Sequence, residues 1–327
     1  MESFGVITRD DYAGFLAFYS CTWTILTLFG AAGNAVNVRT FVCMGINDGF
    51  AISFLALSVL DLSYLVVALA MAVSTAFFTV ELKQPHIFFS VQPYALAIYF
   101  GNFGVMLYLT IQLTTTFIAV ARCMCVAKPL HFKNAFTRRR CAAVLSCLVS
   151  IPVVSYVPIW INMAIVTQFD PSTNTTRPSL WVSPSREFIK DIIWTIEDML
   201  IPFSTEIIVL VCLIVMADGL RKSSKFRMSS LSGCSLSEYG ASGGPHKLSG
   251  KELVIVQQTA VISFLYILTN TPKVASNIVS VLVPEFNLGK KYGNLYLVVI
   301  SFRKLLEMCN SASNLPIYYK CNPKFRS

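Results

Sequence analysis

The stretch FAISFLALSVLDLSYLVVALAMAVSTAFFT, residues 50–79, decides the class of fold. Its 30 residues are almost all apolar and include a single charged side chain, that of Asp61. A helix needs about 20 consecutive apolar residues to cross the roughly 30 Å hydrocarbon core of a bilayer. The stretch therefore predicts a membrane-spanning helix that is tilted or that projects beyond the bilayer.

Outward from this stretch, further apolar runs follow one another with short polar segments between them. The seven predicted spans are residues 13–37, 50–79, 93–127, 141–166, 190–217, 252–283 and 295–319. The chain of 327 residues is 55% hydrophobic and only 13% charged, and its mean hydropathy is +0.62. This composition is too apolar for a soluble domain. We predict an all-α membrane protein, a seven-transmembrane helix bundle in which residues 13–319 form one domain.

The distribution of basic residues predicts the orientation of the bundle. With the N-terminus outside, 16 Lys and Arg residues lie on the inner side and seven on the outer side, as the positive-inside rule requires. Residues 1–12 then form an extracellular N-terminus that lacks the basic region of a cleavable signal peptide. The sequon at Asn174 falls in an outer segment, which predicts N-glycosylation there.

The inner side carries most of the positive charge. Residues 221–251 are rich in Ser and Gly and predict a flexible cytoplasmic loop. We interpret the net charge of +9 as attraction to membrane lipids and to an intracellular partner rather than as a nucleic-acid surface. Cys123 and Cys125 lack the additional His or Cys ligands of a metal site. Neither a metal nor a cofactor is therefore expected.

Ionisable side chains inside the spans are the first candidates for function, because each costs roughly 2.5–3.5 kcal/mol at bilayer depth on insertion scales. Asp61 needs hydrogen-bonding partners at that depth. Polar residues on the first and last spans can supply them. We predict an intramembrane polar network of Asn34, Asp61, Asn310, Ser311 and Asn314.

The same residues and several prolines occur in an order that resembles the family A (rhodopsin-like) G-protein-coupled receptors over nearly the whole chain. The resemblance rests on Gly33-Asn34, Leu57, Asp61, Arg122 with Pro129 seven residues later, Pro202, Pro272, and NSASNLPIYYKCNPKF from Asn310. It implies an extracellular ligand, a heterotrimeric G protein as partner, and the plasma membrane as the location. It also implies that residues 320–327 begin a short amphipathic eighth helix. A sodium ion at Asp61 is a further implication, although Ile111 stands where the family has a helix 3 serine.

The residues that the resemblance assigns to signalling depart from the family in several places. In the helix 7 motif, which reads Asn-Leu-Pro-Ile-Tyr from Asn314 to Tyr318, the proline is shifted by one position. The family's Asp/Glu-Arg-Tyr triplet reads Ala-Arg-Cys around Arg122, and Asn270 replaces the helix 6 tryptophan. We predict a coupling switch of Arg122, Glu252 and Tyr318, in which Glu252 restrains Arg122, so that Glu252→Ala raises basal signalling. Glu206, one turn below the helix 5 proline, has no predicted role. The predicted hinge of helices 5 and 6 consists of Pro202, Tyr266, Asn270 and Pro272.

The outer disulfide of the family is also missing. Ala97 stands where its helix 3 cysteine would be, and the following outer segment has no cysteine. That segment must then be held in another way. These departures, together with GINDGFAISFLALS and RCMCVAKPLHFK, are similar to those of orphan peptide receptors and chemosensory receptors of molluscs and related invertebrates.

Charged side chains in the last three spans are the candidates for ligand binding. Gly104 replaces the helix 3 aspartate of amine receptors, and Met308 replaces the retinal lysine of opsins, so neither ligand fits. The candidate contacts are Tyr108, Glu197, Asp198, Lys273, Arg303, Lys304 and Glu307. Their mixed charges favour a peptide or a small zwitterionic ligand. The alternative is internal pairing, either of Arg303 with Glu307 four residues later or of Lys273 with Glu307 or Asp198.

The favoured function is a G-protein-coupled receptor that binds a ligand in the outer cavity and activates a G protein when helix 6 moves. A decoy receptor that binds without signalling stays open, because the acid and the tryptophan are lost. A transporter or channel is less favoured, since the sequence has no internal repeats and no paired broken helices. An enzyme is not expected, because the sequence lacks nucleophile, metal and phosphate-binding motifs.

Overall fold

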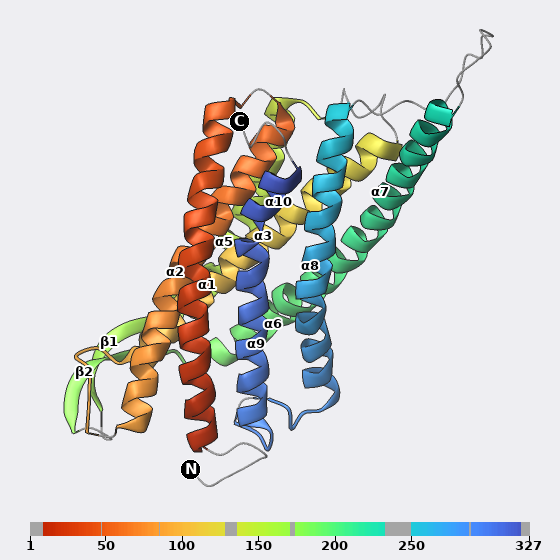
Figure 1. The fold of residues 1–327 in the computed structure, drawn as a ribbon. Helices are drawn as coiled ribbons and strands as arrows, with labels where there is room; N and C mark the ends of the chain where they lie inside the picture. The colour runs from red at the N-terminus through yellow and green to blue at the C-terminus, as the bar shows by residue number, and fades with distance from the viewer. Residues whose placement is uncertain are drawn as a thin grey trace.

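The computed structural model describes residues 9–46, 48–84, 86–127, 136–170, 174–232, 250–287 and 289–321. Its elements are α1 (Arg9–Met44), α2 (Gly49–Lys83), α3 (Pro93–Ala127), α5 (Arg138–Ile161), β1 (Met163–Asp170), β2 (Thr175–Val182), α6 (Arg186–Trp194), η1 (Thr195–Leu200), α7 (Ile201–Ser232), α8 (Gly250–Leu282), α9 (Gly293–Ala312) and α10 (Asn314–Cys321). The long helices stand side by side in one bundle (Figure 1).

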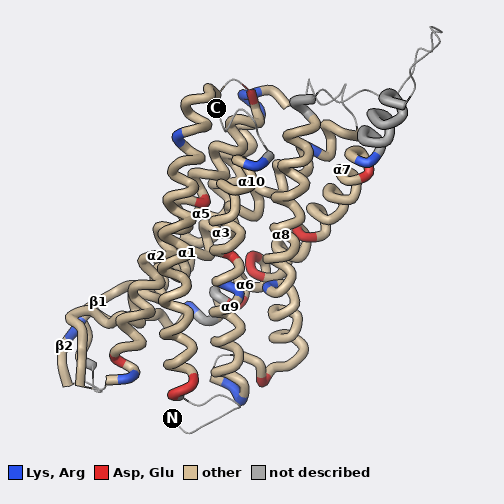
Figure 2. The backbone as a smooth tube through the Cα atoms, viewed as in Figure 1, with Lys and Arg blue, Asp and Glu red and all other residues tan. Residues whose placement is uncertain are grey.

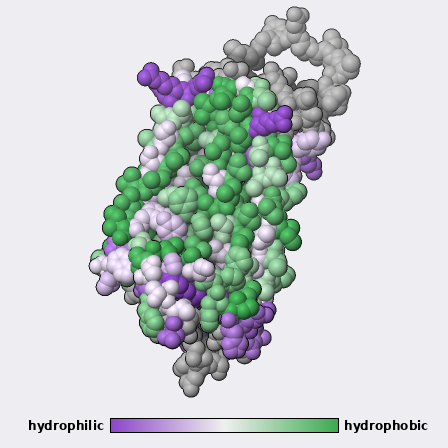
Figure 3. Space-filling view, turned by 90° about the vertical axis from the view of Figure 1, so that its left-hand side faces the viewer, coloured by the Kyte–Doolittle hydropathy of each residue, from purple (hydrophilic) through white to green (hydrophobic). Residues whose placement is uncertain are grey.

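Six described helices are long and apolar enough to cross a membrane: Asp10–Met44, Gly49–Lys83, Pro93–Ala127, Arg138–Ile161, Asp191–Arg221 and Leu253–Leu282. The seventh crossing is made by α9 and α10, which are separated by one residue. Three charged residues, Arg303, Lys304 and Glu307, set α9 apart from the six apolar helices. Apolar residues cover the middle of the face in Figure 3, and hydrophilic residues gather at its two ends. The predicted seven-helix bundle is confirmed.

The two ends of the bundle differ in what they carry. The N-terminus, the β1–β2 hairpin and the start of α9 lie at one end, and the C-terminus and the start of α8 lie at the other (Figure 1). We name the first the outer end and the second the inner end, after the predicted orientation. Figure 2 shows charged residues at both ends and a further group within the bundle, around α6, α8 and α9.

The fourth span ends earlier than predicted. Helix α5 stops at Ile161, and residues 163–166 of the predicted span belong to strand β1. Its sequence MAIVTQFD pairs antiparallel with TTRPSLWV of β2, so that Met163 lies opposite Val182 and Asp170 opposite Thr175. β-branched residues on both segments favour this pairing once they leave the bilayer. The hairpin adds a two-stranded sheet to the predicted helical fold.

Other boundaries differ at the ends of the spans. Helix α1 begins at Arg9, within the predicted N-terminal segment 1–12, because Asp10 and Asp11 in its first turn complement the helix dipole. Helix α7 continues to Ser232, so residues 221–232 of the segment predicted as a flexible loop are helical. The predictions for residues 1–8, for 233–249 and for the eighth helix at 322–327 fall outside the described residues.

An ion pair anchors the hairpin to the bundle. Arg177 Nη1 of β2 lies 2.7 Å from Glu81 Oε1 near the end of α2. The same carboxylate oxygen accepts a hydrogen bond from the backbone N–H of Phe89 at 3.0 Å. The backbone N–H of Gln92, just before α3, donates to the carbonyl of Pro178 at 2.9 Å. Polar contacts with α2 and with the start of α3 therefore hold the outer segment.

Neutralising Glu81 is expected to loosen the hairpin. In Glu81→Gln, Arg177 loses a charge-assisted hydrogen bond, which contributes about 1.5–3 kcal/mol. Hydrogen exchange of the β2 amides, measured by mass spectrometry on the protein in nanodiscs, should become faster. Lys83→Gln, which removes an exposed charge on the same helix end, should leave the exchange unchanged. Native exchange rates in Glu81→Gln would contradict the anchoring role.

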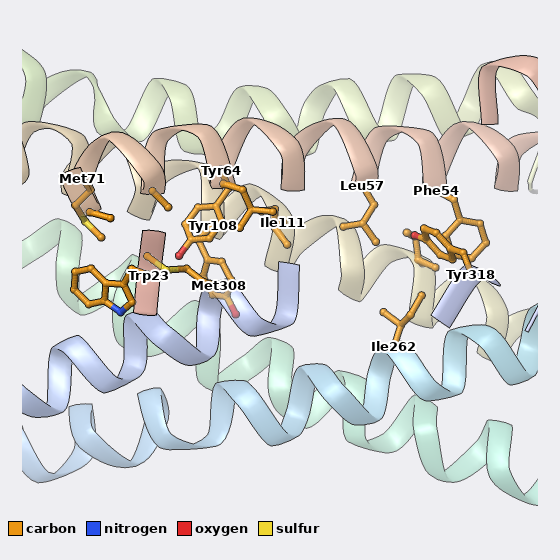
Figure 4. Close-up of a cluster of buried hydrophobic side chains, with 14 of the residues drawn as sticks. Trp23, Phe54, Leu57, Tyr64, Met71, Tyr108, Ile111, Ile262, Met308 and Tyr318 are labelled. Carbon is orange, nitrogen blue, oxygen red and sulfur yellow. The ribbon is translucent and has the colours of Figure 1, made fainter. Parts of the chain in front are cut away.

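The centre of the bundle is filled by aromatic and aliphatic side chains from several helices. In Figure 4, Tyr64 of α2, Tyr108 of α3 and Met308 of α9 lie close together. Phe54 and Tyr318 meet nearer the inner end, with ring centroids 5.6 Å apart. The core thereby links α2 to the last span at two depths.

Candidate functional site

Charged residues gather inside the bundle, around α6, α8 and α9 (Figure 2). Asp198 of η1 pairs with two cations, since its Oδ1 lies 2.7 Å from Lys273 Nζ and its Oδ2 lies 3.0 Å from Arg303 Nη2. Both cations are buried, with Lys273 3% exposed and Arg303 7% exposed. Charges within a membrane bundle are tolerated when they pair with one another. The shared carboxylate therefore makes the burial of both cations possible.

A wide helical turn positions Asp198. Residues Thr195–Leu200 form a π-helix, where the sequence predicted an uninterrupted helix over 190–217. Turns of this kind occur frequently at functional sites. The backbone carbonyl of Asp198 accepts a hydrogen bond from Asn277 Nδ2 of α8, and Asn277 Oδ1 accepts one from Arg303 Nη1 at 2.8 Å. Asn277 therefore ties the π turn to both α8 and α9.

A second acid, Glu307, closes the cluster on the side of α2. Its Oε2 lies 2.7 Å from Lys304 Nζ and accepts a hydrogen bond from the Tyr64 hydroxyl at 3.2 Å. The Tyr64 ring packs against Tyr108 of α3, with centroids 5.4 Å apart (Figure 4). Lys273 Nζ lies 5.6 Å from the centre of the Tyr108 ring. We use the name charged cluster for six residues of η1, α8 and α9: Asp198, Lys273, Asn277, Arg303, Lys304 and Glu307. Through Tyr64 the charged cluster also contacts α2.

The structure brings six of the seven predicted ligand contacts together, and their charges pair internally. Lys273 pairs with Asp198, one of its two predicted partners. The predicted contact of Arg303 with Glu307 does not form, because Asp198 approaches Arg303 from η1 and Lys304 occupies Glu307. Glu197 is the exception: it is buried, but within the described residues it forms no ion pair.

A bridge of hydrogen bonds, which we name the Asn270 bridge, crosses three helices next to this cluster. Gln112 Nε2 of α3 donates to Asn270 Oδ1 at 2.7 Å, and Asn270 Nδ2 donates to Glu206 Oε2 of α7 at 3.2 Å. The Thr271 hydroxyl donates to the other oxygen of Glu206 at 2.5 Å. The bridge directly precedes Pro272, which removes a backbone hydrogen bond from α8. Glu206, which had no predicted role, thus joins α7 to α8.

The other predicted hinge residues also lie between α7 and α8. The hydroxyl of Tyr266 lies 2.8 Å from Thr205 Oγ1, and the carbonyl of Pro202 accepts a hydrogen bond from the same Thr205 hydroxyl at 3.0 Å. Gln112 and Thr205 were not predicted from the sequence as functional residues. An amide in the middle of an apolar span, as in LTIQLTTTF around Gln112, is a signal that points to an interhelical hydrogen bond.

The predicted polar network around Asp61 contains a direct contact between α2 and the last span. Asn314 Nδ2 donates to Asp61 Oδ2 at 2.6 Å. Asp61 is completely buried, and Asn310 and Ser311 are buried at the end of α9. The amide supplies a hydrogen-bond donor that the carboxyl group requires at this depth.

The last span is broken where α1 contacts it. Pro316 has no N–H to donate to the carbonyl four residues earlier, which is that of Ala312, the last residue of α9. The neighbouring carbonyl of Ser311 accepts a hydrogen bond from Asn34 Nδ2 at 2.8 Å. Gly30 allows this close approach, because a Cβ atom there would lie 2.7 Å from the Cβ of Ala312. Asn34 of the predicted network therefore contacts the last span directly beside the break.

At the inner end, Arg122 is buried and lies over an aromatic ring. It is 1% exposed, and its guanidinium carbon lies 3.1 Å from the centre of the Phe50 ring. Tyr318 is fully buried and packs edge-on against Phe54. Glu252 lies in α8, but its side chain is outside the described part of the chain. The predicted pair of Arg122 with Glu252 therefore stays a prediction.

The predicted glycosylation site lies at the turn of the hairpin. Asn174 directly precedes β2, and its side chain is exposed. Its backbone φ is 52°, a left-handed conformation that asparagine adopts more readily than most residues. An exposed turn at the outer end is accessible to the glycosylation machinery, so Asn174 stays a predicted acceptor.

Seven crossing helices with charged and polar residues paired inside the bundle define a seven-transmembrane helical protein with a buried polar site. The chain matches the family model described as serpentine type 7TM GPCR chemoreceptor Srx over residues 25–237, about two thirds of its length. It therefore belongs to this family of G-protein-coupled chemoreceptors. No curated protein matches the chain. Family membership confirms that the chain is a receptor and a multi-pass membrane protein. It does not show the narrower resemblance to family A or to molluscan receptors.

Proposed function

We propose that this chemoreceptor binds a small zwitterionic or peptide ligand at the charged cluster and activates a heterotrimeric G protein at its inner end. The observation that carries the proposal is that two buried cations, Lys273 and Arg303, share one carboxylate, that of Asp198. A ligand carboxylate can replace Asp198 at one of these cations. The ligand's amine can then meet the released acid, so that every buried charge keeps a partner.

The position of the charged cluster on α8 supports a route from binding to signalling. Lys273 directly follows Pro272, where α8 lacks one of its backbone hydrogen bonds. A change of partner at Lys273 therefore acts at the point where α8 bends most easily. A ligand that binds more tightly to the bent arrangement shifts the population toward it.

Reconstitution in nanodiscs with a panel of heterotrimeric G proteins tests this function. The probes are free amino acids and short peptides, each with a matched form whose carboxylate is amidated. We expect nucleotide exchange to increase with the carboxylate forms and not with the amides. Arg122→Ala should abolish the response at native surface expression, whereas Arg39→Ala, an exposed arginine at the inner end of α1, should retain it.

A decoy receptor is the second candidate, and it is favoured by the loss of the acid before Arg122 and by Asn270 in place of a tryptophan. Saturable binding of a probe at the charged cluster without exchange on any G protein would support it. Ion flux without nucleotide exchange would overturn the receptor proposal in favour of a channel or transporter.

A further inference from the structure

We propose that Phe50, at the inner start of α2, holds Arg122 inside the bundle through a cation–π contact and thereby limits signalling without ligand. The inference rests on the proposed function, in which Arg122 couples to the G protein. The residue before Arg122 is Ala121, so no carboxylate is adjacent in sequence. Besides a carboxylate or phosphate, the face of an aromatic ring is a protein surface that binds a guanidinium group well.

The geometry of the contact is that of a strong cation–π pair. The guanidinium carbon of Arg122 lies 3.1 Å from the centre of the Phe50 ring, well inside the limit of about 6 Å for this interaction. Arg122 is 1% exposed, so the guanidinium is removed from solvent. Desolvation places the interaction at the upper end of its range, because water no longer competes for the charge.

An N-cap and a close helix–helix contact fix the backbone at the start of α2, next to Phe50. The Oδ1 of Asp48 caps the helix by accepting from the backbone N–H groups of Phe50 at 3.0 Å and of Ala51 at 2.7 Å. The preceding residue is Gly49, where a Cβ atom would lie 2.6 Å from the Sγ of Cys141. Glycine therefore lets the start of α2 pack directly on the start of α5.

Two further rings support Phe50 from the side of α3. Phe136, just before α5, stacks on Phe50 with centroids 6.1 Å apart and planes 5° apart. Phe117 of α3 stacks in turn on Phe136 at 5.5 Å. Phe117 lies five residues before Arg122 on the same helix. The Phe50 ring therefore lies on α2 and stacks on Phe136. Phe136 in turn connects it to Phe117 on the helix that carries Arg122.

This contact restrains a different pair of helices from the one that the sequence predicted. The predicted Arg122–Glu252 pair would join α3 to α8, whereas the observed contact joins α3 to α2. An arginine that binds a G protein must leave the Phe50 ring. The strength of the cation–π contact therefore contributes to the balance between the restrained and the coupling-competent states.

Stepwise fluorination of Phe50 tests the proposal, because fluorine withdraws electron density from the ring face while the ring keeps its shape. We would incorporate mono-, di- and trifluorophenylalanine at position 50 in the full chain. Basal nucleotide exchange should rise with each fluorine, to about tenfold for the trifluorinated ring. The same series at Phe78, a half-buried ring at the outer end of α2 that packs on Tyr94, should leave basal exchange unchanged.

A second readout does not require a G protein. The thermal unfolding midpoint of the purified chain should fall stepwise along the Phe50 series and should not change along the same series in the Arg122→Met background, where the cation is absent. The difference between the two backgrounds isolates the pair, as in a double-mutant cycle.

The two readouts separate the failure of this inference from the failure of the proposed function. A graded rise in basal exchange with a graded fall in unfolding midpoint supports the restraint. If the native chain activates a G protein and basal exchange is flat along the Phe50 series, the restraint is overturned. If no G protein is activated by any variant, the proposed function fails. Equal changes of the unfolding midpoint in the native and in the Arg122→Met background would overturn the Phe50–Arg122 contact.

Discussion

Asp198→Asn is expected to lower the stability of the folded receptor by about 3–5 kcal/mol, which is the usual cost of removing one member of a buried ion pair. Asn is neutral, so both Lys273 and Arg303, which lie 2.7 Å and 3.0 Å from the carboxylate, would lose their anionic partner inside the bundle. The measurements are the thermal unfolding midpoint of the purified protein in nanodiscs and its surface expression in cells. Both should fall sharply.

Two companion variants show whether the effect comes from unpaired cations. Glu285→Gln neutralises an exposed acid between α8 and α9 and should leave the unfolding midpoint unchanged. Asp198→Asn combined with Lys273→Met should recover part of the loss, because methionine keeps an apolar stem of similar length and removes one buried charge. A native unfolding midpoint in Asp198→Asn would contradict the shared-carboxylate description of the charged cluster.

Asn270→Leu is expected to raise basal nucleotide exchange about threefold to tenfold and to destabilise the bundle. Leucine has the same number and branching of side-chain heavy atoms but cannot form hydrogen bonds, so Gln112 loses its acceptor at 2.7 Å and Glu206 loses a donor at 3.2 Å. Each buried polar group left without its bond costs about 1–3 kcal/mol. Because Asn270 links α8 to both α3 and α7 next to Pro272, its loss removes a restraint on the movement of α8.

Two measurements check this second prediction. Basal exchange reports the change in coupling, and distances between spin labels on the inner ends of α3 and α8 report the movement of α8 directly. Thr259→Val is the matched control on α8, since the buried Thr259 hydroxyl donates only to the carbonyl of Ile255 in the same helix. An Asn270→Leu protein with native distances and native basal exchange would show that the Asn270 bridge does not restrain α8.

The spans themselves could be predicted from the sequence with little error in their centres. The third span was predicted at residues 93–127, and α3 covers Pro93–Ala127. The long apolar run around Asp61 likewise became α2. These predictions succeed because the cost of placing a polar segment in hydrocarbon is large and depends on the local run of residues alone.

Elements that depend on pairing or on local irregularity could not be predicted in the same way. The first four residues of β1, 163–166, were predicted as the end of a helix, because they continue the apolar run and their partner, β2, lies several residues further along the chain. The π turn at Asp198 does not change the pattern of apolar residues, so the sequence gives no signal for it. The seventh span was predicted as one helix, although the shifted Pro316 already indicated where the break between α9 and α10 would fall.

The same distinction applies to the candidate site: its residues could be predicted from the sequence, but their pairing could not. Composition and position identified nearly every charged residue of the charged cluster, because a buried charge in an apolar span is rare and costly. They did not identify which charges pair. Asp198, rather than Glu307, binds Lys273 and Arg303, and Phe50 was not recognised as a contact of Arg122.

By itself, the sequence determined that this chain is a seven-helix membrane protein and which of its side chains must find partners inside the bundle, since both follow from the cost of transferring each segment into hydrocarbon. The tertiary structure decided the partners. Whether Arg122 meets the Phe50 ring, and whether Glu206 reaches Asn270, depends on how each helix is rotated and where it is broken. Those rotations are set by contacts between residues that lie up to hundreds of positions apart, such as Asn314 with Asp61, and a local pattern does not contain them.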